Sequence, residues 1–576
     1  MSAESFIQQK AAAAIQAVYG TEVAETSLQV SVTRKEFEGD YTLVTFPLLK
    51  ITHQAPDATG NAIGEWLVAN VPEIAAFNSV KGFLNLSFSP VYWSENLQAI
   101  AADDSFGQLP DTGKRIMVEF SSPNTNKPLH LGHIRNNLLG DSVSRILKAC
   151  GNTVIKSTIV NDRGVHICKS MYAWEKLFDG ATPESTGKKG DHLVGDCYVA
   201  YAKLEKEHPE VINEVHQMLV DWEAGDPHVR ELWSMMNGWV YKGFDQTYSA
   251  LGITFDQVDH ESETYLLGKE LVQKGLAEGV FVKDPDGSVW CDLTADGLDR
   301  KLVLRGDGTS VYITQDLGTA ERRFANFNLD SHVYVVGNEQ DYHFQVLKLI
   351  LGKLGFEWAQ RIYHLSYGMV ELPEGKMKSR EGTVVDADDL IQSMYEEAKK
   401  TSEESGKLAD ISAEEKDRLY HMIGLGALKY FIIKVDPKKT MLFNPKESID
   451  FNGNTGPFIQ YTHARICSIL RKASVSFGPA DVNASVEPSA KEIRLTQLLS
   501  LYPAKVAEAG AALSPAVIAN YAYDLAKEFN QYYHETPILK EENLAVLKYR
   551  LELIAVMART LRSAMALLGI ELPERM

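Results

Sequence analysis

The sequence predicts an α/β protein whose central domain is built on a parallel sheet, with an α+β domain before it and an all-α helical bundle after it. Strand-like and helix-like segments alternate through the middle of the chain, which is typical of parallel strands joined by crossover helices. Strands and helices are mixed in the first part, and the strand signal fades in the last part. The predicted domains are 1–112, 113–389 and 390–576.

The N-terminal domain is expected to combine helices with short strands. An Ala-rich segment of helical character comes first, and segments with alternating apolar residues follow it. A stretch with Pro and Gly at 108–113 is a plausible linker to the central domain. The expected elements are helices over 4–19 and 61–70 and strands over 27–32, 40–46 and 82–86.

The central domain carries five candidate strands of the parallel sheet. Between the second and the third lies a more polar stretch, about 165–300, which is too long to be a loop and is expected to be a folded insertion. The candidate strands are 115–120, 154–160, 309–314, 332–337 and 363–369.

The C-terminal region shows apolar stripes at helical spacing. Such stripes are far more often core than ligand site, so we expect a helical bundle. One stripe consists of Tyr521, Leu525, Phe529 and Tyr532. Helices are expected over 390–433, 456–477, 490–509, 514–534 and 541–569.

Composition limits the classes of protein that the chain can belong to. Of its 576 residues, 45% are hydrophobic, and no apolar run approaches the roughly 20 residues that cross a bilayer. The first residues lack the basic-then-apolar order of a signal peptide. Five dispersed cysteines argue against a disulfide framework and a structural zinc site. We therefore expect a cytoplasmic protein with no membrane partner and no structural metal.

The net charge of −19 is unfavourable for a polyanionic partner, so any nucleic-acid surface has to be local. Basic residues do gather late in the chain, but on their own they are better explained as solvated helix faces. Composition therefore permits a nucleic-acid partner without indicating one. These residues are Lys434, Lys438, Lys439, Lys446, Arg465, Arg471, Lys472, Arg550, Arg559 and Arg562.

The first candidate site is the tetrapeptide His130-Leu-Gly-His133. A strand-like run ends at Pro123, a polar loop follows, and His130 opens a helix whose N-terminus suits phosphate. The two imidazoles can stabilise charge on a phosphoryl group, and Gly132 lets a flat ring such as adenine approach the backbone. Two histidines at this spacing also fit a metal pair or an ordinary helix start, so the tetrapeptide alone is weak evidence.

A second candidate is Gly375-Lys-Met-Lys-Ser-Arg-Glu-Gly382. Two glycines, two lysines and an arginine in eight residues make a cationic loop that can follow charge onto a leaving pyrophosphate. In isolation an exposed basic turn is the commoner explanation, and the pairing with the first candidate changes that balance.

The two segments together resemble the two signatures of class I aminoacyl-tRNA synthetases. In that class a Rossmann-like sheet carries both signatures, which bind ATP and stabilise formation of the aminoacyl-adenylate. The fuller similarity is to the arginyl-tRNA synthetase family, from residue 115 to the last residue. The other segments that carry it are Ser122-Pro-Asn124, Lys127-Pro128, Tyr312-Ile-Thr-Gln-Asp316, Val336-Gly-Asn-Glu-Gln340, His343-Phe344, Gly453-Asn-Thr-Gly-Pro457, Gln460-Tyr461, Ala464-Arg465 and Leu568–Met576.

The resemblance implies roles for individual residues. A guanidinium is planar and permanently charged, so an arginine pocket needs a carboxylate able to take a forked pair. Asp316 and Tyr312 are four residues apart and match the family's guanidinium contacts; without the resemblance they would be a helix N-cap and a strand-face aromatic. The implied arginine-binding residues are Ser122, Asn124, Glu261, Tyr312, Asp316 and Gln340. The implied ATP-binding residues are His130, Gly132, His133, Lys376 and Met377, and the implied catalytic residues are His130, His133, Lys127, Lys376 and Lys378.

The chain departs from the family pattern at two positions. Ser379 stands where the class I signature usually has a lysine, and Lys127 resembles the lysine thought to substitute for it. Gln315 stands where Arg is common in the family, which leaves the electrostatics of the pocket open.

The function expected from the resemblance is ligation of L-arginine to tRNA-Arg through an arginyl-adenylate. ATP would be the second substrate, accompanied by Mg²⁺. The resemblance also implies that the C-terminal bundle reads the anticodon, that the N-terminal domain touches the tRNA elbow, that tRNA is needed for the first step, and that the enzyme is a monomer. The candidate tRNA contacts are Asn454, Gln460, Tyr461, Arg465 and Met576.

Two other functions remain to be weighed. A small-metabolite nucleotidyltransferase can share the His-x-Gly-His tetrapeptide, but it does not need a long helical C-terminal region. A synthetase-like RNA or protein scaffold that has lost catalysis is disfavoured because His130, His133, Lys376 and Asp316 are all present. Separate titrations with ATP and with tRNA would distinguish the three.

Overall fold

The computed structural model describes residues 3–34, 36–371, 385–405, 411–483 and 485–576. These residues divide into two compact units. The first unit comprises Met1–Phe106, Ile466–Pro503 and Leu525–Thr560, and the second comprises Gly107–Arg465, Ala504–Asp524 and Leu561–Met576. None of the helices in the described ranges combines the length and the apolar character needed to cross a membrane.

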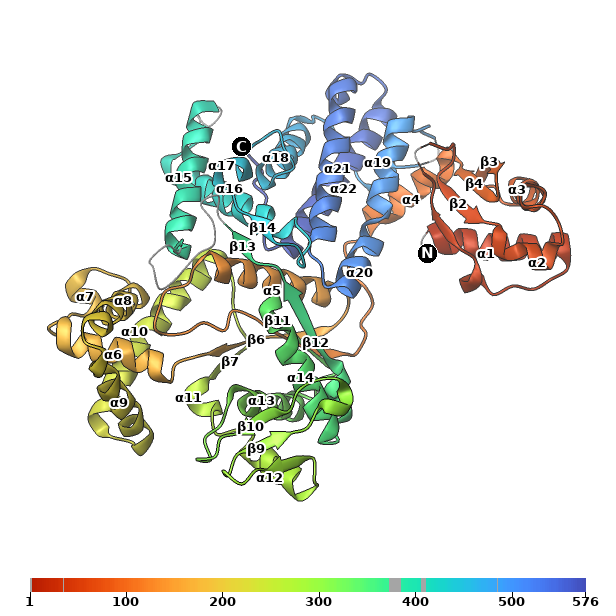
Figure 1. The fold of residues 1–576 in the computed structure, drawn as a ribbon. Coiled ribbons are helices and arrows are strands. Elements are labelled where there is room, and N and C mark those ends of the chain that lie inside the picture. Colours follow the sequence, from red (N-terminus) through yellow and green to blue (C-terminus); the bar gives the residue numbers. More distant parts are fainter. Residues whose placement is uncertain (1–2, 35, 372–384, 406–410, 484) are drawn as a thin grey trace. The chain divides into compact units, whose positions relative to one another are not determined.

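The first unit contains a four-stranded antiparallel sheet with strand order β1-β2-β4-β3. Helices α1 and α3 pack with this sheet around a core that includes Leu43, Leu84 and Trp93 (Figure 1). The elements are α1 (Ala3–Tyr19), β1 (Val30–Val32), β2 (Tyr41–Val44), α2 (Leu49–Thr52), α3 (Pro56–Asn70), β3 (Ile74–Val80), β4 (Phe83–Phe88), α4 (Pro90–Ala102) and α19 (Ala490–Ser500).

The second unit is built on a five-stranded parallel sheet with strand order β12-β11-β5-β6-β7. The chain enters this sheet at the central strand β5 and adds β6 and β7 on one side. It then crosses to the other side of β5 and adds β11 and β12. The order therefore reverses between β5 and β11, which is where α/β sheets of this type bind ligands. The strands are β5 (Arg115–Glu119), β6 (Thr153–Val160), β7 (Gln257–His260), β11 (Ser331–Gly337) and β12 (Ile362–Tyr367).

The expectation of a fifth core strand at 309–314 is wrong. Residues from Tyr312 onward form the first turn of α13 (Tyr312–Phe327), and the missing strand of the sheet is β7. The sheet therefore has the predicted Rossmann-like character with one strand placed differently.

The long stretch expected at 165–300 is divided by β7. Before β7 lie only helices: α6 (Val165–Leu177), α7 (Pro183–Thr186), α8 (Gly190–Glu207), α9 (Ile212–Ala224) and α10 (Pro227–Leu251). After β7 come α11 (Glu261–Thr264), α12 (Lys269–Ala277) and a three-stranded antiparallel sheet of β8 (Phe281–Lys283), β9 (Val289–Cys291) and β10 (Lys301–Leu304).

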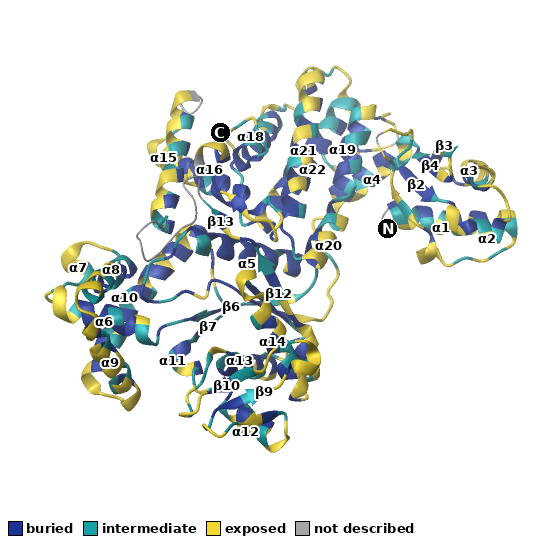
Figure 2. Cartoon of the chain, in the orientation of Figure 1, coloured by how far each residue is buried: buried dark blue, intermediate teal, exposed yellow. Residues whose placement is uncertain are grey.

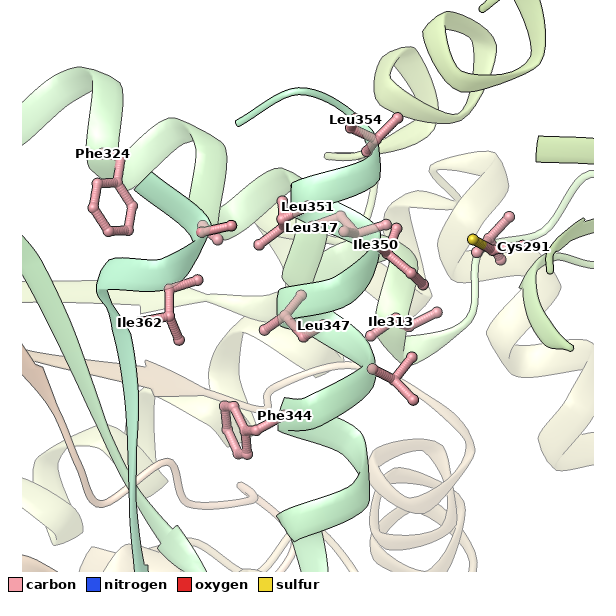
Figure 3. Close-up of a cluster of buried hydrophobic side chains, with 14 of the residues drawn as sticks. Cys291, Ile313, Leu317, Phe324, Phe344, Leu347, Ile350, Leu351, Leu354 and Ile362 are labelled. Atoms are coloured by element: carbon pink, nitrogen blue, oxygen red, sulfur yellow. The ribbon is translucent and has the colours of Figure 1, made fainter. Parts of the chain in front are cut away.

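An apolar core joins this small sheet to the helices beside it. Figure 3 shows Leu317 of α13, Leu347 and Ile350 of α14 (Asp341–Lys353) and Cys291 of β9 in one buried cluster. The central strand β5 and α5 (Leu131–Ala149) are also largely buried, whereas α7 and α9 expose broad faces (Figure 2).

The remaining elements are helical except for one two-stranded sheet, as expected for the C-terminal region. The helix expected over 390–433 is two helices, and so is the one expected over 490–509. The elements are β13 (Val370–Glu371), α15 (Ala387–Ser405), α16 (Ala413–Ile433), β14 (Met441–Leu442), α17 (Pro445–Ser448), α18 (Gly456–Lys472), α20 (Tyr502–Ala512), α21 (Ala516–Glu535) and α22 (Leu544–Leu567).

Candidate active site

The first candidate site lies at the carboxyl ends of β5, β11 and β12, where α5 begins. A cavity of about 310 Å³ opens there. Its described lining consists of side chains from the loop after β5, from the start of α5 and from the two neighbouring strands. These residues are Ser121, Ser122, His130, Gly132, His133, Asn136, Val335, Val336, Tyr367, Met369 and Val370.

The two histidines cap the N-terminus of α5 with their rings. The Gly132 N–H donates to Nδ1 of His130 (3.1 Å), and the His130 backbone N–H donates to Nδ1 of His133 (3.2 Å). The ring centroids lie 4.0 Å apart. Because each Nδ1 accepts a backbone hydrogen bond, each neutral ring carries its proton on Nε2. Both imidazoles are therefore oriented as Nε2–H donors.

Burial keeps these imidazoles neutral. It lowers the pKa of His130 to about 4, with a further contribution from the nearby charge of Lys127. It lowers the pKa of His133 well below the ordinary value, and His130 and Lys127 add to the effect. At pH 7 the pair therefore offers hydrogen-bond donors and carries no positive charge.

The loop after β5 is fixed by Asn136, a residue that the sequence did not single out. Its Oδ1 accepts from the backbone N–H of Ser121, and its Nδ2 donates to the Val335 carbonyl (2.7 Å) and to Tyr367 Oη (3.2 Å). One buried amide thus joins α5 to three strands. It supports a loop in which Ser121 and Ser122 both adopt left-handed backbone angles, with φ of 76° and 48°.

Gly132 is needed where the tetrapeptide turns into the helix. A Cβ at this position would lie 2.9 Å from Cε1 of the His130 ring, closer than real Cβ atoms approach. A larger residue would displace the imidazole that caps the helix.

Asn124 and Lys127 lie in the same loop as the histidines. Asn124 forms a parallel bridge with Asn161, so this part of the loop extends the pairing of β5 with β6. The Lys127 side chain is partly buried, and burial lowers its pKa. Ser122 is exposed at the rim of the cavity.

The predicted guanidinium contacts come from α11 and from the first turns of α13. Glu261 is buried, Asp316 is partly exposed, and Tyr312 is 71% exposed. Burial raises the pKa of Glu261 to about 7; Arg163 opposes this shift, and the charges of Asp162 and Asp316 add to it. Asp316 accepts a hydrogen bond from Nε2 of His343 (2.6 Å). Glu261 and Asp316 thus bring two carboxyl groups close enough to influence each other electrostatically.

Gln315, which stands where the family often has Arg, hydrogen-bonds with Glu261 and so favours its ionised form. Gln340 ends a short 3₁₀ helix at the carboxyl end of β11 and is exposed.

Two buried networks that no sequence motif indicates support this region. Arg323 of α13 pairs with Glu119 at the end of β5 and with Asp259 of β7 (2.7 Å). Asp162 accepts from Tyr241 Oη (2.7 Å) and from the Ser262 N–H (2.8 Å), directly beside Glu261. The only available signal was a charged residue inside an amphipathic or strand-like run, which the sequence alone does not distinguish from a surface charge.

The second candidate, including Lys376, Met377 and Lys378, lies outside the described residues. The described chain resumes at Val385, whose carbonyl accepts from the Leu131 N–H (3.0 Å). The Ala387 N–H in turn donates to the Leu129 carbonyl (3.0 Å), so this segment pairs with the backbone around His130.

The candidate tRNA contacts differ in exposure. Gln460 is fully buried, and its Nε2 donates to the carbonyls of Met422 (3.0 Å) and Glu571 (2.9 Å). Asn454 accepts from Tyr430 Oη (2.6 Å), and the Arg465 guanidinium lies over the Tyr461 ring. Met576 is partly exposed. Gln460 therefore has an internal packing role in this structure, and its predicted contact with tRNA stays a prediction, as do the other four.

Comparison with known proteins shows the family to which a chain with this fold and this pair of histidines belongs. Residues 96–444 match the family model described as "tRNA synthetases class I (R), catalytic domain". Residues 459–576 match the "DALR anticodon binding domain". A protein of Bacteroides thetaiotaomicron named arginine–tRNA ligase is 58% identical, with 98% of each chain covered. The chain belongs to the arginyl-tRNA synthetase family.

Other relatives agree with this membership. An arginine–tRNA ligase of Porphyromonas gingivalis is 54% identical over the whole of both chains. Among solved structures, the arginyl-tRNA synthetase of Thermus thermophilus superposes with a TM-score of 0.84, at 26% identity and full coverage of both chains. The fold predicted from the sequence is therefore that of the arginyl-tRNA synthetase family.

Proposed function

We propose that this protein ligates L-arginine to tRNA-Arg, using ATP and an arginyl-adenylate intermediate. The observation that carries the proposal is the capped N-terminus of α5, with its two neutral imidazoles, in a chain 58% identical to an arginine–tRNA ligase over nearly its full length. In the first step the arginine carboxylate attacks the α-phosphate of ATP and pyrophosphate leaves. In the second, a ribose hydroxyl at the 3′ end of the tRNA takes the arginyl group and AMP leaves.

His130 and His133 are proposed to stabilise the phosphoryl transition state. Their Nε2–H groups are donors on partly buried rings, where hydrogen bonds to developing negative charge are stronger than in open water. Gly132 leaves room at the backbone for the adenine ring, and Lys127 supplies a cation beside the phosphates. Lys376, Met377 and Lys378 are proposed to contribute from the second signature on the basis of the family pattern.

Glu261, Asp316 and Tyr312 are proposed to receive the guanidinium. Burial raises the pKa of Glu261 and the charges of Asp162 and Asp316 add to the shift, so a permanent cation bound beside it would stabilise the ionised carboxylate. Ser122, Asn124 and Gln340 are proposed to orient the α-amino and carboxylate end of the substrate, because they lie at the carboxyl ends of β5 and β11. The arginine carboxylate would then face the start of α5.

Mg²⁺ is proposed to arrive as part of the ATP complex. The described lining of the cavity offers imidazole, hydroxyl and amide groups and no carboxylate, which suits a metal held by phosphate oxygens and water. Such an ion would neutralise charge on the phosphates during transfer.

The tRNA is proposed to be read through residues 459–576, because the family model that matches them is an anticodon-binding domain. We further propose a monomer that works in the cytoplasm, where its cysteine thiols would stay reduced.

The test is a charging assay of the purified protein with tRNA-Arg and each amino acid in turn, together with arginine-dependent ATP–pyrophosphate exchange. Arginine alone should be charged. Loss of exchange in a folded protein that still binds tRNA would instead favour a scaffold, and exchange without any tRNA product would favour a nucleotidyltransferase.

Asp316→Asn tests the arginine pocket itself. Removing this charge should raise the KM for arginine by about a hundredfold, since a charge-assisted forked pair is lost, while the KM for ATP changes little. His343→Gln is the matched control, because it removes the partner of Asp316 and keeps the carboxylate. Equal losses for arginine and ATP would contradict the assignment.

A further inference from the structure

A partly buried polar cluster joins the inserted helices α8 and α10 to the residues that begin α15. At its centre is Lys189, the residue before α8. Its ammonium donates to Asp388 Oδ2 (2.6 Å), to Thr247 Oγ1 (2.6 Å) and to Asp191 Oδ2 (3.2 Å). These three bonds use all three of its donors. The cluster is thus a cross-link between segments about 200 residues apart in the chain.

Asp388 is held from more than one side. Its Oδ2 also lies 3.1 Å from Nε2 of His192, and its Oδ1 accepts from the Thr247 hydroxyl (2.8 Å). Burial alone would raise the pKa of Asp388, but the hydrogen bonds from His192, Lys189 and Thr247 and the charge of Lys189 lower it strongly. The carboxylate is therefore ionised and fully hydrogen-bonded at neutral pH.

The base of the cluster is rigid because two glycines let α8 and α10 approach closely. A Cβ at Gly190 would lie 2.3 Å from the carbonyl oxygen of Trp239, and one at Gly243 would lie 2.3 Å from Asp191 Oδ1. Lys189 is thus presented from a fixed surface.

On the other side, Asp388 immediately follows the backbone that pairs with the tetrapeptide. The segment 385–387 bonds to residues 129–131 in antiparallel fashion, with Asp386 opposite His130. A displacement of Asp388 would therefore reach the residue that caps α5.

We propose that Lys189, His192 and Thr247 are positioning residues for the proposed reaction: by holding Asp388 they hold 385–387 against 129–131 and so set the place of the His130 ring. They do not touch the substrates in this arrangement, and they act through the backbone. Asp191, His192 and Asp388 each place one possible metal-ligand atom within 4.8 Å of the others. We assign no metal to them, because the Lys189 ammonium is already bonded to both carboxylates. The proposal rests on the function proposed above.

Lys189→Met is the main test, because it removes the ammonium with little change in volume. Arginine-dependent pyrophosphate exchange in the presence of tRNA-Arg should lose about tenfold or more in kcat, with KM values for arginine and ATP within about twofold of the wild type. A displaced transition-state donor lowers kcat per folded molecule, whereas a loss of folded protein alone leaves kcat per folded molecule unchanged, so kcat is expressed per folded molecule.

Lys169→Met is a closely matched control. Lys169 pairs with Glu205 at 2.9 Å on the same helical insertion, and the side chains are 15% and 32% exposed. The Lys189 and Asp388 side chains are 16% and 31% exposed. The control should lose the same order of thermal stability and keep the wild-type kcat.

Two more variants make the outcome decisive. In the double variant Lys189→Met/Asp388→Asn, kcat should be close to the kcat of the more affected single variant. The effects of the two substitutions should not add, because both remove the same contact. If Lys189→Met does not fold, Thr247→Val of similar shape should still lower kcat several-fold. A wild-type kcat in the folded variants, or a loss equal to that of Lys169→Met, would overturn the positioning role. Absence of exchange in the wild type would overturn the proposed function instead.

Discussion

At the scale of single residues, burial shifts the pKa values on the two sides of the proposed site in opposite directions. It lowers the pKa of the two imidazoles and raises the pKa of a carboxyl group, and both shifts favour the neutral form. His130 and His133 lose water and stay neutral, since desolvation lowers the pKa of a cationic acid. Glu261 loses water and is half protonated near pH 7, since desolvation raises the pKa of a carboxyl group. Neutral hydrogen-bond donors suit phosphate transfer, in which negative charge grows on oxygen. A carboxyl group with a raised pKa is stabilised in its ionised form when a cation binds beside it.

Glu261 therefore predicts a pH dependence of arginine binding. Its pKa of about 7 in the free enzyme means that most molecules carry a neutral Glu261 at pH 6 and an ionised one at pH 8. A guanidinium binds the ionised form, so the KM for arginine should fall by about tenfold from pH 6 to pH 8. Steady-state kinetics with arginine as the varied substrate measure this.

Glu261→Gln should bind arginine more weakly and should remove most of that pH dependence. Glu263→Gln on the same short helix is the control, because Glu263 is exposed, and it should keep the wild-type profile. An unchanged profile in Glu261→Gln would assign the titration to another group.

At the scale of elements, the sequence predicted best the elements with a strong period and clear ends. The expected strands at 115–120, 154–160, 332–337 and 363–369 are confirmed as β5, β6, β11 and β12 within one or two residues. The strand expected over 309–314 failed because Val311, Ile313 and Leu317 fit a strand and the first turns of a helix equally well over so short a run. The helix forms because the Val311 backbone N–H donates to Thr314 Oγ1 and so caps the start of α13.

Several strands were not predicted, and two of them show further reasons. β3 pairs with β4 through the two-residue turn Lys81-Gly82, in which both residues have positive φ. Such turns are recognised from Asn-Gly or Asp-Gly, and lysine at the first position gives no such signal. β7 is only four residues long and ends in charged residues that serve the buried pairs with Arg323 and Asp162. Tertiary partners, which the sequence does not show, determined this strand.

The candidate site follows the same division. His130, Gly132 and His133 were found because a motif and a helix start coincide in the sequence. Asn136 and Arg323 were not, because each acts through partners far away in the chain.

Asn136 links α5 by hydrogen bonds to the ends of three strands. Substitution of Asn136 is therefore expected to loosen the structure locally. Asn136→Ala would leave the Ser121 N–H and the Val335 carbonyl without their partner in a buried place, a cost of about 3 kcal/mol. Hydrogen exchange by mass spectrometry should show faster exchange of peptides covering 116–122 and a lower thermal midpoint.

Asn137→Ala is the control for this helix. Asn137 is fully buried beside Asn136, but its amide atoms have no hydrogen-bond partner among the described residues. Its removal should cost about 1 kcal/mol and should leave exchange at 116–122 unchanged. Equal effects of the two substitutions would contradict the cross-linking role of Asn136.

At the scale of the whole molecule, the chain is distributed over two units whose segments alternate in the sequence, so the C-terminal residues complete a unit that begins hundreds of residues earlier. The last segment lies against α16 and α18. The buried Lys429 donates to the Gly569 carbonyl (2.7 Å), Gln460 donates to Glu571 (2.9 Å), and His463 bonds to the Pro573 carbonyl (2.9 Å). Burial lowers the pKa of Lys429 to about 8, a sign of how little water reaches it.

Deletion of 569–576 should therefore destabilise the second unit as a whole. It would remove acceptors from three buried donors and expose the surface that Ile570 covers, a loss on the order of 5 kcal/mol. Differential scanning calorimetry should show a lower transition for the truncated chain, and exchange activity should fall in proportion to the folded fraction. Glu574→Gln is the control, because it alters the exposed pair with Arg562 and should change stability by less than about 0.5 kcal/mol. A truncated chain that unfolds like the wild type and fails only in tRNA charging would show that this segment serves tRNA binding and not the stability of the unit.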